Sequence, residues 1–219
     1  MGRSIAFRVA LLLGPAAVAA AFACAQPAPA DGAVAASLVD RFEGRTLSTR
    51  KWEYRWGSVR VRSGRLTLAS RPPRRPAQTY SALVTSRASF GDHAFRVRTK
   101  TVERLRRTTR PNTWEVGWVF FRFRDLENYY YFILKPNGWE LGKKHGSDEQ
   151  IFLATGGGKR LVLGRWHRIR IRATGARIRA WVDGARVLDF TDPDPIRTGK
   201  VGLYEEDARV RFDTVVVRP

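Results

Sequence analysis

The residue types best suited to ligand chemistry gather between positions 114 and 145. The stretch is rich in aromatic residues, and the candidates for contact with a ligand are Trp114, Trp118, Tyr129, Tyr131 and Trp139. Aromatic rings offer large flat apolar faces, and Trp and Tyr add a polar atom at the rim. Faces of this kind stack against sugar rings. We therefore expect the segment to form the base of a ligand-binding groove.

Cationic side chains accompany these rings. The Arg122 guanidinium and the Lys143 ammonium are suited to binding carboxylate, sulfate or hydroxyl oxygens. The candidate ligand-binding set is therefore Trp114, Trp118, Arg122, Tyr129, Tyr131, Trp139 and Lys143. In the alternative interpretation, loops such as the basic segment 104–112 cover this face and the rings are ordinary packing.

Catalysis stays open at this stage. Glu115 and Glu140 lie on separate predicted strands, where they could face each other as the carboxylate pair that glycoside hydrolysis requires. A polysaccharide lyase instead needs a cation for the uronate and a side chain that takes a proton, roles for which Arg122, Tyr131 and His145 are candidates. The alternative for both glutamates is surface charge or an arginine partner.

Short runs of alternating apolar and polar residues, separated by Gly, Pro, Asn and Asp, predict strands throughout the chain. The clearest pair is 166–173 with 177–182, in which one parity is apolar and the other carries arginines. Such a pattern is typical of a sheet with one buried and one solvated face. The chain is therefore expected to be an all-β antiparallel sandwich of the jelly-roll type.

The run 114–123 departs from that pattern because both parities are apolar or aromatic. A sheet that is apolar on both faces needs a cover, and no helix is predicted to provide one. The alternate side chains that point outward would then line the groove. Which parity faces outward is not fixed by the pattern, since a one-residue shift inverts it.

The first residues read as a targeting segment. Arg3 and Arg8 precede an apolar run and small residues, which predicts a signal peptide over 1–25, a Pro/Ala linker over 26–35 and one domain over 36–219. The protein is thus expected outside the cell. Cys24 is the only cysteine, and a lipid anchor through it is the less favoured alternative. No second apolar run is long enough to span a membrane.

The charge balance is strongly basic, with 40 Lys and Arg against 20 Asp and Glu, or +20. Such a surface attracts polyanions, among them acidic polysaccharide and an acidic cell envelope. A GC-rich genome is the alternative source of the arginines. Export argues against nucleic acid as a partner. We expect a monomer that binds a poly- or oligosaccharide.

Three parts of the sequence combine turn glycines with aromatic and apolar strand residues. They are Val116–Arg122 with Asn128–Phe132, Trp166–Ile169 with Val182–Gly184, and Gly199–Leu203 with Phe212–Val215. Together they resemble the concanavalin A-like lectin/glucanase superfamily, and most closely its laminin-G-like domains and the bacterial 3-keto-disaccharide hydrolase domain family. The resemblance covers residues 38–218 and rests mainly on structural glycines and aromatics.

The resemblance implies a carbohydrate ligand and leaves the activity open. The E-x-D-x-x-E strand motif of the glucan-cleaving members is absent. Related sandwiches often hold calcium between their first and last strands, which makes Asp40, Glu43 and Asp213 candidate ligands for Ca²⁺. Zinc is not expected, because histidines and cysteines do not cluster. A binding module, a lyase or hydrolase, and a non-catalytic envelope or adhesion protein remain the alternatives.

Overall fold

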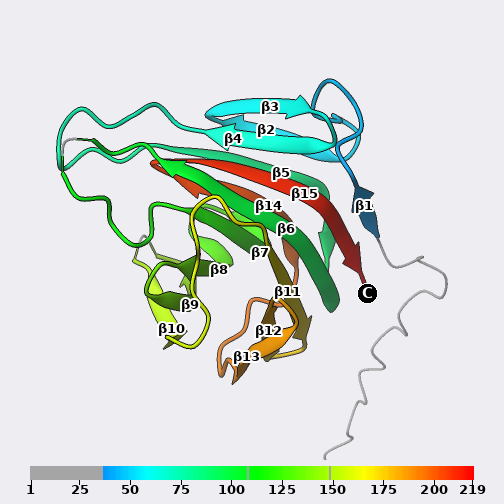
Figure 1. The fold of residues 1–219 in the computed structure, drawn as a ribbon. Helices are drawn as coiled ribbons and strands as arrows, with labels where there is room; N and C mark the ends of the chain where they lie inside the picture. Colours follow the sequence, from blue (N-terminus) through cyan, green and yellow to red (C-terminus); the bar gives the residue numbers. More distant parts are fainter. Residues whose placement is uncertain (1–36, 108, 148) are drawn as a thin grey trace, which may run out of the picture. The chain divides into compact units, whose positions relative to one another are not determined.

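The computed structural model describes residues 37–107, 109–147 and 149–219. Over these residues the chain forms strands and connecting segments with no helix, and every strand pair is antiparallel. The strands make two sheets, shown in Figure 1. The predicted signal peptide and linker lie outside the described residues.

Sheet A has eight strands, one of which, β1, joins only β15. In spatial order they are β13 (Ala185–Thr191), β12 (Arg177–Val182), β11 (His167–Thr174), β6 (His93–Arg104), β15 (Ala208–Arg218), β4 (Arg65–Ala69) and β3 (Ser58–Arg62), with β1 (Leu38–Asp40) beside β15.

Sheet B has seven strands. In spatial order they are β10 (Ile151–Gly156), β9 (Gly138–His145), β8 (Asn128–Lys135), β7 (Gly117–Asp125), β14 (Gly199–Glu206), β5 (Ser81–Phe90) and β2 (Trp52–Trp56).

The two sheets pack face to face around an apolar core. A Cβ atom built on Gly117 of β7 would lie 2.6 Å from Cγ1 of Val210 on β15, so this parity of β7 points at sheet A. Val119 and Phe121 share that parity and are fully buried. Trp118 and Phe120 have the opposite parity and lie on the outer face of sheet B, which resolves the ambiguity in the sequence pattern.

The predicted hairpin of 166–173 and 177–182 is confirmed as β11 and β12, paired from Ile169–Val182 to Thr174–Arg177. Its isoleucines are buried and its alternate arginines point outward. The antiparallel sandwich predicted from the sequence is likewise confirmed. Its core is large enough to hold the domain together, with no cysteine among the described residues.

A bulge at Arg122 changes the parity near the end of β7. Arg122 has a φ of 49°, unusual for a side chain of its size, and the register with β8 shifts between Phe121 and Asp125. Phe123 therefore joins Phe120 on the outer face, where the two rings stack at 6.0 Å. Within the described residues, no helix is long and apolar enough to cross a membrane.

Candidate functional site

The outer face of sheet B carries a continuous cluster of aromatic rings. Ring centroids lie 5.0 Å apart for Trp118 and Tyr131, 4.7 Å for Phe120 and Tyr129, and 4.9 Å for Phe120 and Tyr204. We call this cluster the aromatic floor, made of Trp118, Phe120, Phe123, Tyr129, Tyr131 and Tyr204. All of its members except Tyr204 are buried. The floor is therefore a packed support that offers little ring surface of its own.

Two more accessible aromatic residues stand beside this floor. Trp114, 44% exposed, receives a hydrogen bond at its carbonyl from the Trp118 indole N–H at 2.8 Å. Phe152, 66% exposed, pairs across the ladder with Gly142, whose missing Cβ leaves room for the Tyr131 hydroxyl. Both side chains are exposed enough for a ligand to contact their rings.

Glu206 lies next to Trp114 at the end of β14. The Tyr204 hydroxyl donates to its Oε2 at 2.9 Å. Burial, reinforced by the charges of Asp207 and Glu115, raises the pKa of Glu206 to about 7, although hydrogen bonds from Tyr204 and Trp114 oppose the change. The carboxyl group thus changes its charge near neutral pH, which is the property required of a general acid or base.

A second carboxylate occupies the other side of the aromatic floor. The Tyr131 hydroxyl donates to Glu140 Oε1 at 3.0 Å, and Lys135 Nζ binds Oε2. Burial and the Glu140 charge raise the pKa of Tyr131 well above its usual value, so its phenol stays protonated. Glu140, Ile133, Trp118 and Tyr204 form one row across four strands. The backbones of Glu140 and Tyr204 are therefore three strand spacings apart across the sheet, about 14 Å.

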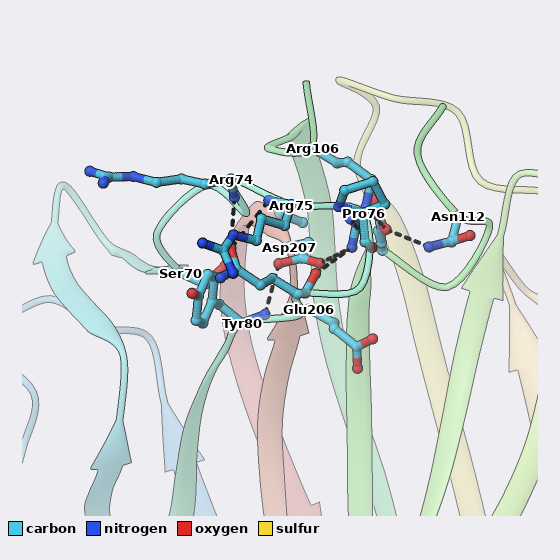
Figure 2. Close-up of polar contacts among 12 residues, drawn as sticks. Ser70, Arg74, Arg75, Pro76, Tyr80, Arg106, Asn112, Glu206 and Asp207 are labelled. Atoms are coloured by element: carbon cyan, nitrogen blue, oxygen red, sulfur yellow. Dashed lines mark hydrogen bonds and ion pairs between the residues drawn. The ribbon is translucent and has the colours of Figure 1, made fainter. Parts of the chain in front are cut away.

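The segment that carries Trp114 is tied down by a buried arginine (Figure 2). Arg106 Nε binds Glu115 Oε1 at 2.5 Å, and its Nη2 binds Asp207 Oδ2 at 2.7 Å. Nη1 and Nη2 also donate to the carbonyls of Pro76 and Gln78 at 2.8 Å. All three charged side chains are at most 1% exposed. Arg106 thereby joins the 105–116 segment to the turn between β14 and β15.

This arrangement separates the two glutamates that the sequence suggested as a carboxylate pair. Glu115 belongs to the Arg106 cluster and also accepts from Asn112 Nδ2 at 2.8 Å. Glu140 is bound to Tyr131 and Lys135 on the outer face of sheet B. The structure does not bring the two carboxylates into contact.

The candidate ligand-binding residues divide between the two faces of sheet B. Trp118, Tyr129 and Tyr131 meet in the aromatic floor. Trp139 stacks on Phe132, which lies on the inner face with Val119. Lys143 is opposite Tyr130, also on the inner face, and binds Asp192 at 2.9 Å.

Two further candidates bind loops at the edge of the sandwich. Arg122 is fully buried and donates to the carbonyls of Gly175 and Ile196 at 2.7 and 2.9 Å. Its third contact is Asp92, at 3.1 Å. His145 Nδ1 lies 2.7 Å from Asp194 Oδ2. Neither side chain contacts the aromatic floor through these bonds.

Two of the three residues suggested for calcium, Asp40 and Asp213, bind other groups. Asp40 accepts from the Phe42 N–H at 2.9 Å and the Trp52 indole N–H at 2.7 Å. Glu43 lines the same surface depression, whereas Asp213 binds Arg98 at 3.0 Å. No group of three or more His, Cys, Asp or Glu in the described part of the chain is placed to hold a metal ion.

Sequence reasoning did not identify Phe152, Tyr204 and Glu206 as members of one site. Tyr204 and Glu206 share a parity on β14, and that period of two was a usable signal. That signal is weak because three consecutive acidic residues, at 205–207, are typical of a turn, whereas β14 continues through Glu206. Phe152 carried no signal, since β10 is an irregular edge strand.

The adjacent Glu205 yields a prediction about stability. Its side chain is fully buried, its Oε1 has no hydrogen-bond partner among the described residues, and burial raises its pKa to about 8. The folded state therefore retains a proton that the unfolded state loses near pH 4.5. Stability from this group is complete below pH 4.5 and decreases as the pH rises towards 8.

We therefore expect Glu205→Gln to gain stability relative to the unmodified protein as the pH rises from 5 to 8. At 1.36 kcal/mol per pKa unit, the relative gain is about 2–4 kcal/mol. Urea denaturation at both pH values measures it, with exposed Glu127→Gln as the control that should follow the unmodified protein. Equal pH dependence in all three proteins would contradict the assignment.

Comparison with known proteins places the fold. The model of the 3-keto-alpha-glucoside-1,2-lyase-like domain family matches residues 37–218. The carbohydrate-binding module CBM66 from Bacillus subtilis superposes with a TM-score of 0.64 at 17% identity, covering 80% of this chain and 99% of that one. Among curated proteins, no sequence matches the chain.

Two glucan-cleaving enzymes are similar in fold. The Bacillus licheniformis beta-glucanase superposes with a TM-score of 0.59 at 12% identity, covering 85% of this chain and 100% of that one. The laminarinase from Flavobacterium sp. UMI-01 gives 0.58 at 12% identity, over 83% of this chain and 99% of that one. These likenesses identify a jelly-roll sandwich, as the sequence predicted.

Proposed function

Since the chain belongs to the family of 3-keto-alpha-glucoside-1,2-lyase-like domains, we propose that it binds a poly- or oligosaccharide on the outer face of sheet B. One observation carries the proposal: an accessible Trp114 ring and the Glu206 carboxyl stand beside a packed aromatic floor. A sugar ring stacks its apolar face on an aromatic ring, and its hydroxyls bind a carboxylate. The floor fixes both groups in place before the ligand arrives.

The ligand occupies the area between Trp114 and Phe152. Tyr129 and Tyr131 lie in the floor between them, and Glu140 and Lys135 supply polar contacts at one side. Arg122, Trp139 and Lys143 take no part, because their bonds hold loops or the inner face. The strand register of sheet B decides which of the candidate side chains point to its outer face.

Binding assays on paired variants test this proposal. The purified protein is titrated calorimetrically with a panel of neutral oligosaccharides. We expect Trp114→Ala to weaken binding at least tenfold, about 1.4 kcal/mol, because the stacking face is lost. Trp181→Ala, on the outer face of sheet A, should change the affinity less than twofold. Equal affinities in the two variants, or no binding across the panel, would overturn the proposal.

Cleavage of the bound sugar is a second candidate, favoured by the pKa of Glu206. The name of the family likens its domains to a 3-keto-alpha-glucoside-1,2-lyase. In such an elimination, a base removes the C2 proton, which the neighbouring keto group acidifies, and the C1–O bond to the leaving group breaks. A carboxyl with a pKa of about 7 is half ionised at neutral pH and suits this task.

Incubation with a 3-keto-alpha-glucoside tests the second candidate. Release of the leaving group should decrease at least a hundredfold in Glu206→Gln, whose amide is not a base, while sugar binding persists. Undiminished release in this variant would rule out Glu206 as the base. No release by the unmodified protein would leave binding alone as the function.

We also propose that the domain acts outside the cell as a monomer after removal of residues 1–25. The support is the charged, apolar and small-residue order of that segment. Mass spectrometry of the exported protein should give a mature chain that begins after Ala25. A chain that begins at a lipid-modified Cys24 would establish the anchor instead.

A further inference from the structure

The outer face of sheet A is rich in basic side chains, whereas the outer face of sheet B is rich in aromatic ones. Alternation along its strands directs one cationic side chain after another away from the core. We call this surface the basic face, made of Arg60, Arg62, Arg65, Arg96, Arg98, Lys100, Arg168, Arg170, Arg172, Arg179, Arg209 and Arg211.

Many of these cations stand directly opposite one another on neighbouring strands. Like charges in such positions destabilise a sheet. The opposed pairs are Arg62–Arg65, Arg96–Arg170, Arg98–Arg168 and Arg172–Arg179. Burial, together with the charges of Arg96, Arg172 and Arg179, lowers the pKa of Arg170. The folded protein therefore maintains an electrostatic repulsion that a bound anion would relieve.

Some hydrogen-bond donors on the basic face also lack an acceptor among the described residues. The Nε atoms of Arg170 and Arg179 are buried and have no hydrogen-bond partner among the described residues. The nearby carboxylates are already occupied, since Asp213 binds Arg98 at 3.0 Å and Glu103 binds Arg107 and Arg209. Unpaired donors of this kind are costly unless a ligand satisfies them.

The basic face is hollowed in two places. One depression of about 670 Å³ is lined by Arg60, Arg62, Arg65, Arg209 and Arg211, with small polar residues between them. A second, of about 470 Å³, is lined by Arg96, Arg98, Arg168, Arg170 and Trp181.

Trp166 joins the two depressions. The guanidinium carbons of Arg65 and Arg98, one from each depression, lie 5.9 and 5.1 Å from its ring centroid. From β3 to β12 the surface crosses five strand spacings, about 24 Å. The two depressions thus form one elongated strip, suited to a chain molecule more than to a single small anion.

Composition alone does not account for this surface. A general excess of arginine would spread evenly over both sheets, but the balance of charge differs between them. On sheet B, Glu53 and Glu140 are paired with Lys200 and Lys135. On the basic face, the twelve cations far outnumber the neighbouring acids Glu103, Asp189 and Asp213. The positive charge is concentrated on one face. This segregation indicates a binding surface.

We propose that the basic face binds a linear polysaccharide that carries carboxylate or sulfate groups. Arginine forks bind both anions through paired hydrogen bonds, and the repulsion between opposed guanidiniums is relieved as the anions enter. The choice of a polysaccharide over a nucleic acid rests on the proposed function of the domain. This second surface is separate from the site on sheet B.

Matched charge variants test the proposal. The variant Arg96→Gln/Arg168→Gln/Arg172→Gln removes three exposed cations of the strip, and Arg45→Gln/Arg50→Gln/Arg75→Gln removes three exposed cations elsewhere. Affinities for polygalacturonate, heparin, neutral dextran and a DNA duplex are measured at 50 and 300 mM NaCl. We expect polygalacturonate or heparin to bind, at least tenfold more weakly in the strip variant and within threefold in the control. The two probes distinguish carboxylate from sulfate, and dextran should not bind.

Three results would overturn the proposal: equal losses in the two variants, tighter binding of the DNA duplex than of either acidic polysaccharide, or no binding at 50 mM NaCl. The Trp114→Ala variant separates this proposal from the proposed function. It should bind the acidic polysaccharide normally, while the strip variant should bind the sheet B sugar normally. If one of the two binding proposals fails, the result for the other face can therefore still be interpreted.

Discussion

Replacing Arg106 with methionine is expected to lower the free energy of unfolding by about 3–5 kcal/mol, because two carboxylates would lose their buried counter-charge. Glu115 and Asp207 are both fully buried, and the guanidinium contacts each of them. Oε2 of Glu115 already has no hydrogen-bond partner in the described part of the chain. Methionine fills a similar volume and supplies no charge or donor.

Urea denaturation measures this loss. The control is Arg107→Met, since the neighbouring side chain is 66% exposed and its pair with Glu103 contributes little, about 0–1 kcal/mol. If Arg106→Met is too unstable to purify, Arg106→Lys keeps the charge and loses the fork, and it should fall between the two. Similar stabilities for the Arg106 and Arg107 variants would show that the cluster does not hold the 105–116 segment.

The second large effect is expected at Lys143. Its ammonium lies 3.1 and 2.9 Å from the two Asp192 oxygens and 2.6 Å from the Asp194 carbonyl. Asp192 is 1% exposed and also accepts from the Tyr130 hydroxyl. Lys143→Met should therefore lower the free energy of unfolding by about 3 kcal/mol, because it leaves a buried carboxylate without its cation.

A double-mutant cycle with Asp192→Asn tests the cause of that loss. The coupling energy should exceed about 1 kcal/mol, since each single change breaks the same pair. Lys100→Met, on the outer face of sheet A, is the control and should cost less than about 0.5 kcal/mol. Sugar affinity should be unchanged in the folded Lys143 variant. A stable Lys143→Met protein that had lost sugar binding would instead place Lys143 at the ligand.

The fold was predictable because its strongest signals are local. The alternation of isoleucine and arginine in β11 and β12 fixed both the hairpin and its solvated face. The family match over residues 37–218 confirms the resemblance identified from the strand and turn motifs. The edge strand β10 was not predicted, because its sequence has no regular period of two. The edge strand β2 was also not predicted, although Trp52, Tyr54 and Trp56 alternate with charged residues.

The site was less predictable because long-range contacts decide it. The bulge at Arg122 moves Phe123 to the outer face. Nothing in the residue pattern of the run 114–123 predicts the φ of 49° at Arg122. Arg106 and Asp207 are 101 residues apart in sequence and meet in the folded protein. Arg122 and Lys143 have the residue types of ligand-binding cations, but their donors are taken by carbonyls and Asp192.

The indole N–H resonances of the tryptophans test the central claim most directly. The sequence has 7 tryptophans, distributed over the core and both outer faces. In a titration followed by nuclear magnetic resonance, a sugar bound on sheet B should shift the signals of Trp114 and Trp118. The core indoles of Trp52 and Trp139, and those of Trp166 and Trp181 on sheet A, should stay in place. Shifts confined to Trp166 and Trp181 would contradict a sugar site on sheet B.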